Sequence, residues 1–294
     1  MKKIPNDKRA LPYGSAFAVA DPETLAILDI PLDLTCLSNN TVVDRFLSLH
    51  AKWVQSTVKN TITGLDRFKF RCYSNGTSES FDKFYMKNKN RRFRCFRGEY
   101  LYHSLAWRNG YNWQFIDEQT LDMKENDALV ISLPFADTGN CHSLYTNTLN
   151  KCNKLGIPVL VDCAYFGVCQ NITFDFTHPA ITDVVFSLSK AFPVAYARIG
   201  IRYSIEDTDD TLFVYQKIDY VNKIGASLGI RYLQNFSPDY ISDKYKEKQL
   251  AMCAKLTVEP SNTVLFGLGD NKWNEYNRGG EKNRLSFHKQ YIAI

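Results

Sequence analysis

Two almost uninterrupted apolar runs in the middle of the chain constrain its fold more than any other feature. Residues 128–133 read ALVISL and residues 157–161 read IPVLV, and residues 144–155 between them have the apolar spacing of a helix. A strand is apolar along its whole length when both of its faces are buried, as happens inside a parallel sheet. Strands that alternate with helices form open, mostly parallel sheets. We therefore predict an α/β protein with three layers, α/β/α, around such a sheet.

The same alternation covers most of the chain. Further strands are expected at 68–73, 92–96, 183–186 and 199–203, and further helices at 42–59, from the turn at 74–78 up to residue 85, and at 104–109. Beyond residue 203 the pattern changes, with helices expected from 211 to 254 and short strands at 256–258, 263–266 and 284–287. We predict a large domain at residues 36–205 and a small α+β domain formed by residues 1–35 and 206–294.

Charge and composition exclude several classes of protein. The 36 Lys and Arg residues exceed the 31 Asp and Glu residues by 5, an excess too mild to indicate a nucleic-acid partner. The apolar runs are far shorter than the ~18–20 residues of a membrane span, and the run GSAFAVA at 14–20 is too short for a signal peptide. The eight cysteines are scattered without a CxxC pair, so we predict neither disulfides nor a metal site, and expect a cytoplasmic location.

The most basic stretch, KNKNRRFRCFR at residues 87–97, is interleaved with aromatic residues. Such a pattern is compatible with nucleic acid or an acidic partner. We interpret it instead as a solvated loop that leads into a strand whose Phe93 and Cys95 face inward.

Residues 161–202 hold the richest set of polar side chains. In chain order they are Asp162, Tyr165, Ser187, Ser189, Lys190 and Arg198. Asp162 ends one predicted strand and Ser187 ends the next. Ligands of open α/β sheets bind at the carboxyl ends of the strands, so this set is predicted to form a site there.

This set resembles the core of fold-type I pyridoxal 5′-phosphate (PLP) enzymes, in particular the class I/II aminotransferases, whose pattern is Asp-x-x-Tyr, then Ser-x-Ser-Lys, then Arg eight residues after the lysine. The resemblance implies that Lys190 forms a Schiff base with the PLP aldehyde. It also implies that Asp162 keeps the pyridine nitrogen of PLP protonated and that Tyr165 lies beside the cofactor oxygen. A lysine amine in a partly desolvated site and a carboxylate opposite the ring nitrogen suit these roles.

The resemblance also implies how the cofactor phosphate is held. Ser187, Ser189 and Arg198 would supply hydroxyl donors and a bidentate cation. The turn Gly76, Thr77 and Ser78 stands between a strand and a helix, where backbone amides are free to meet a phosphate, and it resembles the first phosphate-binding turn of the family.

Two further residues are assigned by their place in the chain. The family has an aromatic residue stacked on the cofactor in the region of FRGEYLYHSLAWRNG at 96–110, and we assign Tyr100 to it, with Tyr102 and then His103 as alternatives. Arg284 lies in EKNRLSFHKQYI at 281–292, which resembles the strand whose arginine binds the α-carboxylate of the substrate.

The chain departs from the family pattern at three places. In LPFADTG at 133–139, Ala136 and Asp137 stand where the family has Asn and Pro, so the usual amide contact to the cofactor is missing. Tyr196 stands where a small residue usually precedes the phosphate arginine, which indicates a different turn. Arg284 lies only 86 positions after Arg198 (284 − 198), so the small domain is expected to be shorter than in typical relatives.

The resemblance implies a PLP-dependent aminotransferase that acts on an amino acid or related amine, with a keto acid as second substrate, and that forms a homodimer. Two alternatives stay open. The first is a PLP enzyme of another reaction class, such as a decarboxylase, lyase or oxidase, with which Ala136 and the short C-terminal region are compatible. A non-catalytic protein of this fold, which binds a ligand or partner, is the second. The residues do not specify the substrate.

Overall fold

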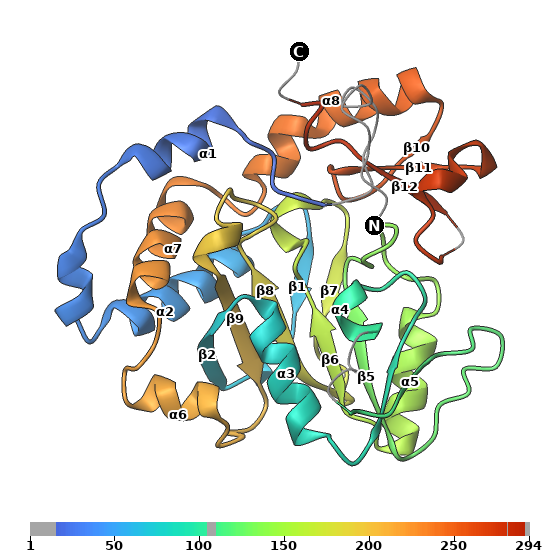
Figure 1. Cartoon of the computed structure of the whole chain (residues 1–294), viewed down its shortest axis with the longest axis horizontal. Coiled ribbons are helices and arrows are strands. Elements are labelled where there is room, and N and C mark those ends of the chain that lie inside the picture. The colour runs from blue at the N-terminus through green and yellow to red at the C-terminus, as the bar shows by residue number, and fades with distance from the viewer. Residues whose placement is uncertain (1–15, 105–109, 281, 292–294) are drawn as a thin grey trace.

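The computed structural model describes residues 16–104, 110–280 and 282–291, and its centre is a seven-stranded sheet with the strand order β2-β9-β8-β6-β5-β3-β4 (Figure 1). The strands are β2 (Phe70–Asn75), β3 (Arg92–Cys95), β4 (Trp113–Phe115), β5 (Asp127–Ser132), β6 (Val159–Asp162), β8 (Ile181–Ser187) and β9 (Ile199–Ser204). Neighbouring strands are parallel except where β9 pairs with β2 and β8. The predicted α/β fold with a mostly parallel sheet is confirmed.

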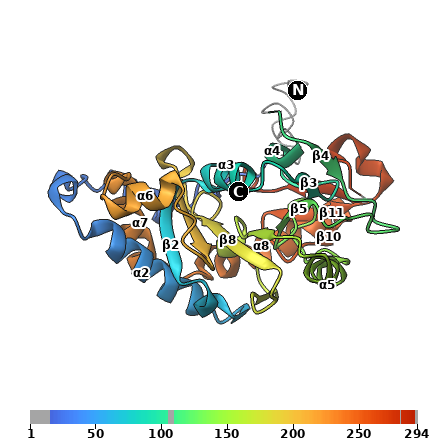
Figure 2. The ribbon, with the colours of Figure 1, turned by 90° about the horizontal axis from the view of Figure 1, so that it is seen from below.

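Alternate residues of the central strands pack against different helix layers. On β5, Val130 packs with residues of α3 (Thr77–Lys87), whereas Leu129 belongs to the larger cluster that includes residues of α2 (Val42–Gln55) and α5 (Tyr145–Leu155). Figure 2 shows α3 on the opposite side of the sheet from α2 and α5. Both faces of the strand are therefore buried, which is why its sequence is apolar without alternation.

The remaining elements surround this core. They are α1 (Pro22–Ala26), β1 (Thr61–Thr63), α4 (Leu101–Ser104), β7 (Thr173–Asp175), α6 (Thr211–Lys217), α7 (Lys223–Asn235), α8 (Tyr240–Leu256), β10 (Glu259–Pro260), β11 (Phe266–Gly269) and β12 (Asn283–Ser286). β10, β11 and β12 form an antiparallel sheet, and β1 pairs with β7 in parallel. None of the described helices is both long and apolar enough to cross a membrane.

Several predicted boundaries are wrong in the C-terminal part. No strand covers 256–258, because α8 continues to Leu256 and ends where Thr257 adopts a left-handed conformation with φ of +55°. The strand expected at 263–266 begins only at Phe266. The short strands β1, β4 and β7 were not predicted. Of the helix expected at 104–109, residues 105–109 lie outside the described residues.

The segment that follows residue 16 packs on α7 and α8. Asp21 accepts a hydrogen bond from the Tyr245 hydroxyl (2.8 Å) and pairs with Lys244 (2.6 Å). The Tyr232 hydroxyl donates to the carbonyl of Thr24 (2.9 Å). These contacts join the N-terminal residues to the C-terminal helices, and the predicted division into two domains stays a prediction.

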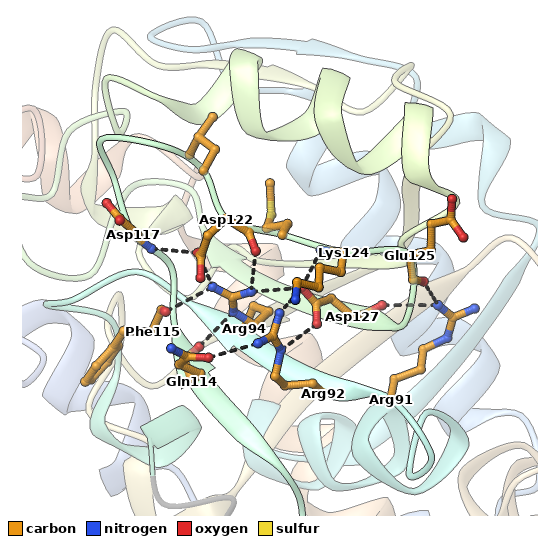
Figure 3. Close-up of polar contacts among 12 residues, drawn as sticks. Arg91, Arg92, Arg94, Gln114, Phe115, Asp117, Asp122, Lys124, Glu125 and Asp127 are labelled. Atoms are coloured by element: carbon orange, nitrogen blue, oxygen red, sulfur yellow. Dashed lines mark hydrogen bonds and ion pairs between the residues drawn. The ribbon is translucent and has the colours of Figure 1, made fainter.

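The basic stretch at 87–97 has the predicted order, a mostly exposed turn that leads into β3, but it also contains a buried ion-pair network that was not predicted. Arg92 pairs with Asp127 through two hydrogen bonds (2.8 and 3.0 Å), and Arg94, fully buried, donates to the same carboxylate (2.9 Å) and to Asp122. Figure 3 shows this network. Phe93 is buried as predicted, but the strand buries its other face too, with arginines whose charges are matched inside the protein.

Candidate functional site

Asp162 and Lys190 meet at the carboxyl edge of the sheet. Asp162 is the last residue of β6, where it lies beside Val185 of β8 in the parallel register. Lys190 follows the end of β8 by three residues. Each of these two groups affects the pKa of the other, so their side chains share one electrostatic environment.

Burial favours the uncharged form of both groups. It raises the pKa of the Asp162 carboxyl to about 7, against the Ala164 amide, which donates to Oδ1 (3.1 Å), and against the Lys190 charge. Burial lowers the pKa of the Lys190 amine, with Tyr165 and Asp162 acting in the opposite direction and Arg284 in the same. The Lys190 ammonium donates a hydrogen bond to the carbonyl of Ala16 (2.7 Å). A lysine with a lowered pKa is more often the neutral, nucleophilic amine.

A cradle for an anion lies beside this pair, at the start of α3. Gly76 precedes the helix with φ of +76°, a conformation that favours glycine, and the Arg198 guanidinium packs against it, since a Cβ atom there would lie 2.1 Å from Arg198 Nη2. Arg198 Nη2 donates to the carbonyl of Asn75 (3.1 Å), which holds it at the helix N-terminus. Thr77 and Ser78 form the first turn of α3. An amide-rich helix end and an arginine together suit a phosphate group.

The two serines that precede Lys190 face each other across the turn after β8. The Ser187 hydroxyl donates to Ser189 Oγ (3.1 Å) and accepts from the Ser189 amide (3.2 Å). Ser187 pairs in register with Gly200, and a Cβ atom at Gly200 would lie 2.8 Å from the Gly76 Cα atom. The serine turn and the start of α3 are therefore brought together by β9.

The aromatic candidates separate by their contacts. Burial raises the pKa of Tyr100, the charge of Asp162 acts in the same direction, and the charge of Arg198 opposes both. The Tyr102 hydroxyl instead donates to Asp82 of α3 (2.7 Å). His103 is buried against the Tyr85 hydroxyl (2.6 Å), and burial lowers its pKa to about 3. The arrangement favours Tyr100 as the residue that faces the site.

Arg284 reaches the site from β12. Its Nη1 donates to the carbonyl of Ala136 (2.5 Å) and to the Tyr165 hydroxyl (3.3 Å), and its guanidinium lies 4.4 Å from the centre of the Phe266 ring. The side chain is fully buried, and burial lowers its pKa to about 10. Tyr165 thereby joins the predicted substrate arginine to the predicted cofactor residues.

Three charged residues of this region were not singled out as site residues from the sequence. The charge of Arg278, six residues before Arg284, helps to lower the pKa of Lys190 and opposes the rise in the pKa of Asp137. Asp137 is buried in contact with Gly280, and burial raises its pKa to about 6. Glu99 is buried directly before Tyr100. None of the three carried a usable signal, because each lies in a loop without a periodic pattern and Glu99 follows a basic stretch that ends in Arg97 and Gly98.

Comparisons with known proteins bear on the fold. No protein-family model and no curated protein sequence matches the chain. Solved structures match over nearly the whole length. The tyrosine aminotransferase from Leishmania infantum aligns with a TM-score of 0.64 over 98% of this chain and 96% of its own, at 14% identity. The aromatic aminotransferase from Pyrococcus horikoshii OT3 gives 0.64 over 94% and 90%, at 11% identity. A PLP-bound C-S lyase from Staphylococcus hominis gives 0.66 over 100% and 92%, at 10% identity.

The chain has the fold of PLP-dependent aminotransferases. Within this aminotransferase fold, two of the noted departures have visible consequences. Tyr196 is 98% exposed, so the turn before Arg198 directs the large side chain outward. At the position where the family has Asn, Ala136 offers its main-chain carbonyl to Arg284.

Proposed function

We propose that the chain is a PLP-dependent aminotransferase that acts on an amino acid or related amine, with a keto acid as second substrate. The observation that carries this proposal is the gathering of Lys190, Asp162 and the Gly76–Arg198 cradle at one edge of the sheet. An amine of lowered pKa, a buried carboxyl and an anion cradle are the three groups that an aldehyde, a ring nitrogen and a phosphate require.

The donor chemistry of the described residues fits PLP. Arg198, Ser187, Ser189 and the Gly76–Thr77–Ser78 turn would hold the phosphate, and Tyr100 would lie against the ring. Asp162 would face the ring nitrogen, because one carboxyl oxygen is fixed by the Ala164 amide and the other has no described donor. Bound PLP supplies an electron sink that weakens bonds at the substrate Cα.

The protein's own groups would then direct the reaction. Lys190 would hold the cofactor and afterwards carry a proton to and from the substrate carbon as general base and acid. Tyr165 would orient the cofactor oxygen and, through its hydrogen bond, Arg284. Arg284 would bind the substrate α-carboxylate, for which it must exchange the Ala136 carbonyl.

A second reaction class within PLP chemistry is supported by a specific observation. Ala136 lacks the side-chain amide of the family pattern, and a PLP-bound C-S lyase is among the matching structures. A lyase, decarboxylase or oxidase would use the same lysine and carboxyl but break a different bond. A binding protein without catalysis has no use for an amine of lowered pKa, which makes that alternative weaker.

Purified protein supplied with PLP tests the proposal. We expect a visible absorption band that borohydride abolishes, and amine exchange that requires a keto acid such as 2-oxoglutarate. Release of ammonia, carbon dioxide or sulfide without a keto acid would instead support the second reaction class. Protein that neither binds PLP nor is modified at Lys190 would overturn both.

We also propose a homodimer. Apolar side chains of residues 25–37 are exposed by 37–59%: Leu25, Leu28, Ile30, Leu32, Leu34 and Leu37. This segment is held on α7 by Arg231, which donates to the carbonyls of Ile30 (2.9 Å) and Pro31 (2.6 Å). A run of exposed apolar residues on an ordered segment is typical of an interface.

Light scattering is expected to give the mass of two chains for the wild type and of one chain for the Leu28→Asp, Leu34→Asp double variant, since two buried unpaired charges disrupt an apolar interface. A monomeric wild type, or a dimeric variant, would argue against this surface.

We further propose a cytoplasmic location, supported by eight cysteines that are all unpaired and mostly buried. Recovery of the protein outside the cytoplasm in cell fractionation would contradict it.

A further inference from the structure

Glu99 is a buried carboxyl group that the proposed reaction does not use. It lies in the loop between β3 and α4, immediately before Tyr100, and is 6% exposed. Its carboxylate accepts hydrogen bonds from both donors of Ser132, the amide (2.7 Å) and the hydroxyl. A buried carboxyl that accepts from a main-chain and a side-chain donor is held in one orientation.

Ser132 relates Glu99 to two parts of the candidate site, the Asp162 carboxyl and the predicted substrate arginine, Arg284. It is the last residue of β5 and lies beside Asp162 in the parallel register. Its Oγ also accepts a hydrogen bond from the Ala136 amide (2.8 Å), and the Ala136 carbonyl accepts from Arg284. Hydrogen bonds therefore fix the backbone of Ala136 on both sides, to Ser132 and Glu99 through its amide and to the predicted substrate arginine through its carbonyl.

Glu99 and Asp162 also form a pair of buried acids. Burial, together with the charge of Asp162, raises the pKa of Glu99 to about 7 against the hydrogen bonds from Ser132. Two neighbouring carboxylates in an apolar environment ionise together only when a cation lies close by. In the proposed function that cation is the protonated ring nitrogen of PLP.

We propose that Glu99 is a positioning residue of the cofactor site, which fixes Ser132 and the 132–136 turn and adds a second negative charge behind Asp162 to retain the protonated ring. This inference rests on the proposed function. The proposed role and a purely structural role of Glu99 predict different effects of removing its charge. A second charge opposes folding of the empty protein but favours the cofactor, so its removal changes the two properties in opposite directions.

The variant Glu99→Gln tests this inference, because the amide has the same shape and can still accept from the Ser132 amide. We expect the cofactor-free protein to unfold at the same or a higher temperature, while the dissociation constant for PLP, followed by absorbance, rises at least about tenfold. Asp239→Asn is the matched control. Asp239 is likewise buried and accepts from a hydroxyl, that of Thr57 (2.5 Å), and from an amide, that of Val58 (2.7 Å), but lies at the start of α8. It is expected to lower the unfolding temperature without weakening PLP binding.

Equal PLP affinity of Glu99→Gln and wild type would overturn the inference and leave the proposed function intact. If the unfolding temperature of cofactor-free Glu99→Gln falls together with its affinity for PLP, Glu99 has a structural role. That result would also overturn the inference. If Glu99→Gln does not fold, Ser132→Ala decides: it keeps the charge but breaks the hydroxyl link, and we expect about fivefold weaker PLP binding, with unchanged binding as the contrary result. A wild type that binds no PLP would remove the proposed function and this inference together.

Discussion

Replacing Lys190 with alanine is expected to eliminate covalent attachment of PLP and to lower amine exchange by at least about 10³-fold, since no other described amine lies beside Asp162 to act as general base and acid. The fold should persist, because the lost described contacts of the amine are a hydrogen bond to Ala16 and its approach to the Phe17 ring (5.8 Å). Borohydride reduction followed by peptide mass spectrometry measures the attachment, and the initial rate with 2-oxoglutarate measures the exchange.

Lys246→Ala provides the control for this experiment. Lys246 is also partly buried, with a pKa lowered chiefly by burial, but it belongs to α8 and donates to Gln249 (2.9 Å) outside the site. This variant should keep both the attachment and the rate. A wild-type adduct found on any lysine other than 190 would refute the assignment.

Asp127→Asn is expected to cost about 3–5 kcal/mol of unfolding free energy, because it breaks the buried network of Figure 3 and leaves Arg94 with only part of its countercharge. Burial alone would raise the pKa of Asp127, but the hydrogen bonds and charges of Arg92 and Arg94 outweigh it, and the pKa is lowered. A carboxylate with a lowered pKa stabilises the folded state above its unfolded pKa of about 3.9, and that stability is lost as pH falls through the folded value.

Urea unfolding at neutral pH and at a series of pH values below 4 checks this prediction. The variant should be less stable at neutral pH and should lose less stability on acidification than the wild type. Asp209→Asn, at a side chain that is 85% exposed, is the control and should change little. A loss below about 1 kcal/mol at Asp127 would mean that the arginines find other partners.

The central sheet could be predicted from the sequence because a strand that is buried on both faces has an almost unbroken run of apolar residues. β5 and β6 are unbroken apolar runs, and each was predicted to within about two residues. The short strands β1, β4 and β7 have no such pattern, since each is only three residues long and most of their residues are partly or fully exposed. The end of α8 was misjudged because the left-handed Thr257, rather than a glycine or proline, terminates it.

The candidate site was predictable where spacing along the chain determines position in space. Asp162, Ser187 and Lys190 follow strand ends, and parallel strands bring their ends to one edge. Side chains that come from loops, such as Glu99, Asp137 and Arg278, have no periodic pattern, so their arrival at the site depends on tertiary packing. The burial of Arg94 was missed for the same reason: its countercharges, Asp122 and Asp127, lie about thirty residues further along the chain.

The contact between Arg284 and residue 136 has a wider consequence. Arg284 is held there by a peptide carbonyl, which every amino acid provides, so the clamp does not depend on which side chain residue 136 carries. Within the space that the buried surroundings of Ala136 allow, its side chain could differ without removing this hydrogen bond. A motif search that demands asparagine at this place would therefore pass over proteins built in the same way, and comparing backbones would recover them.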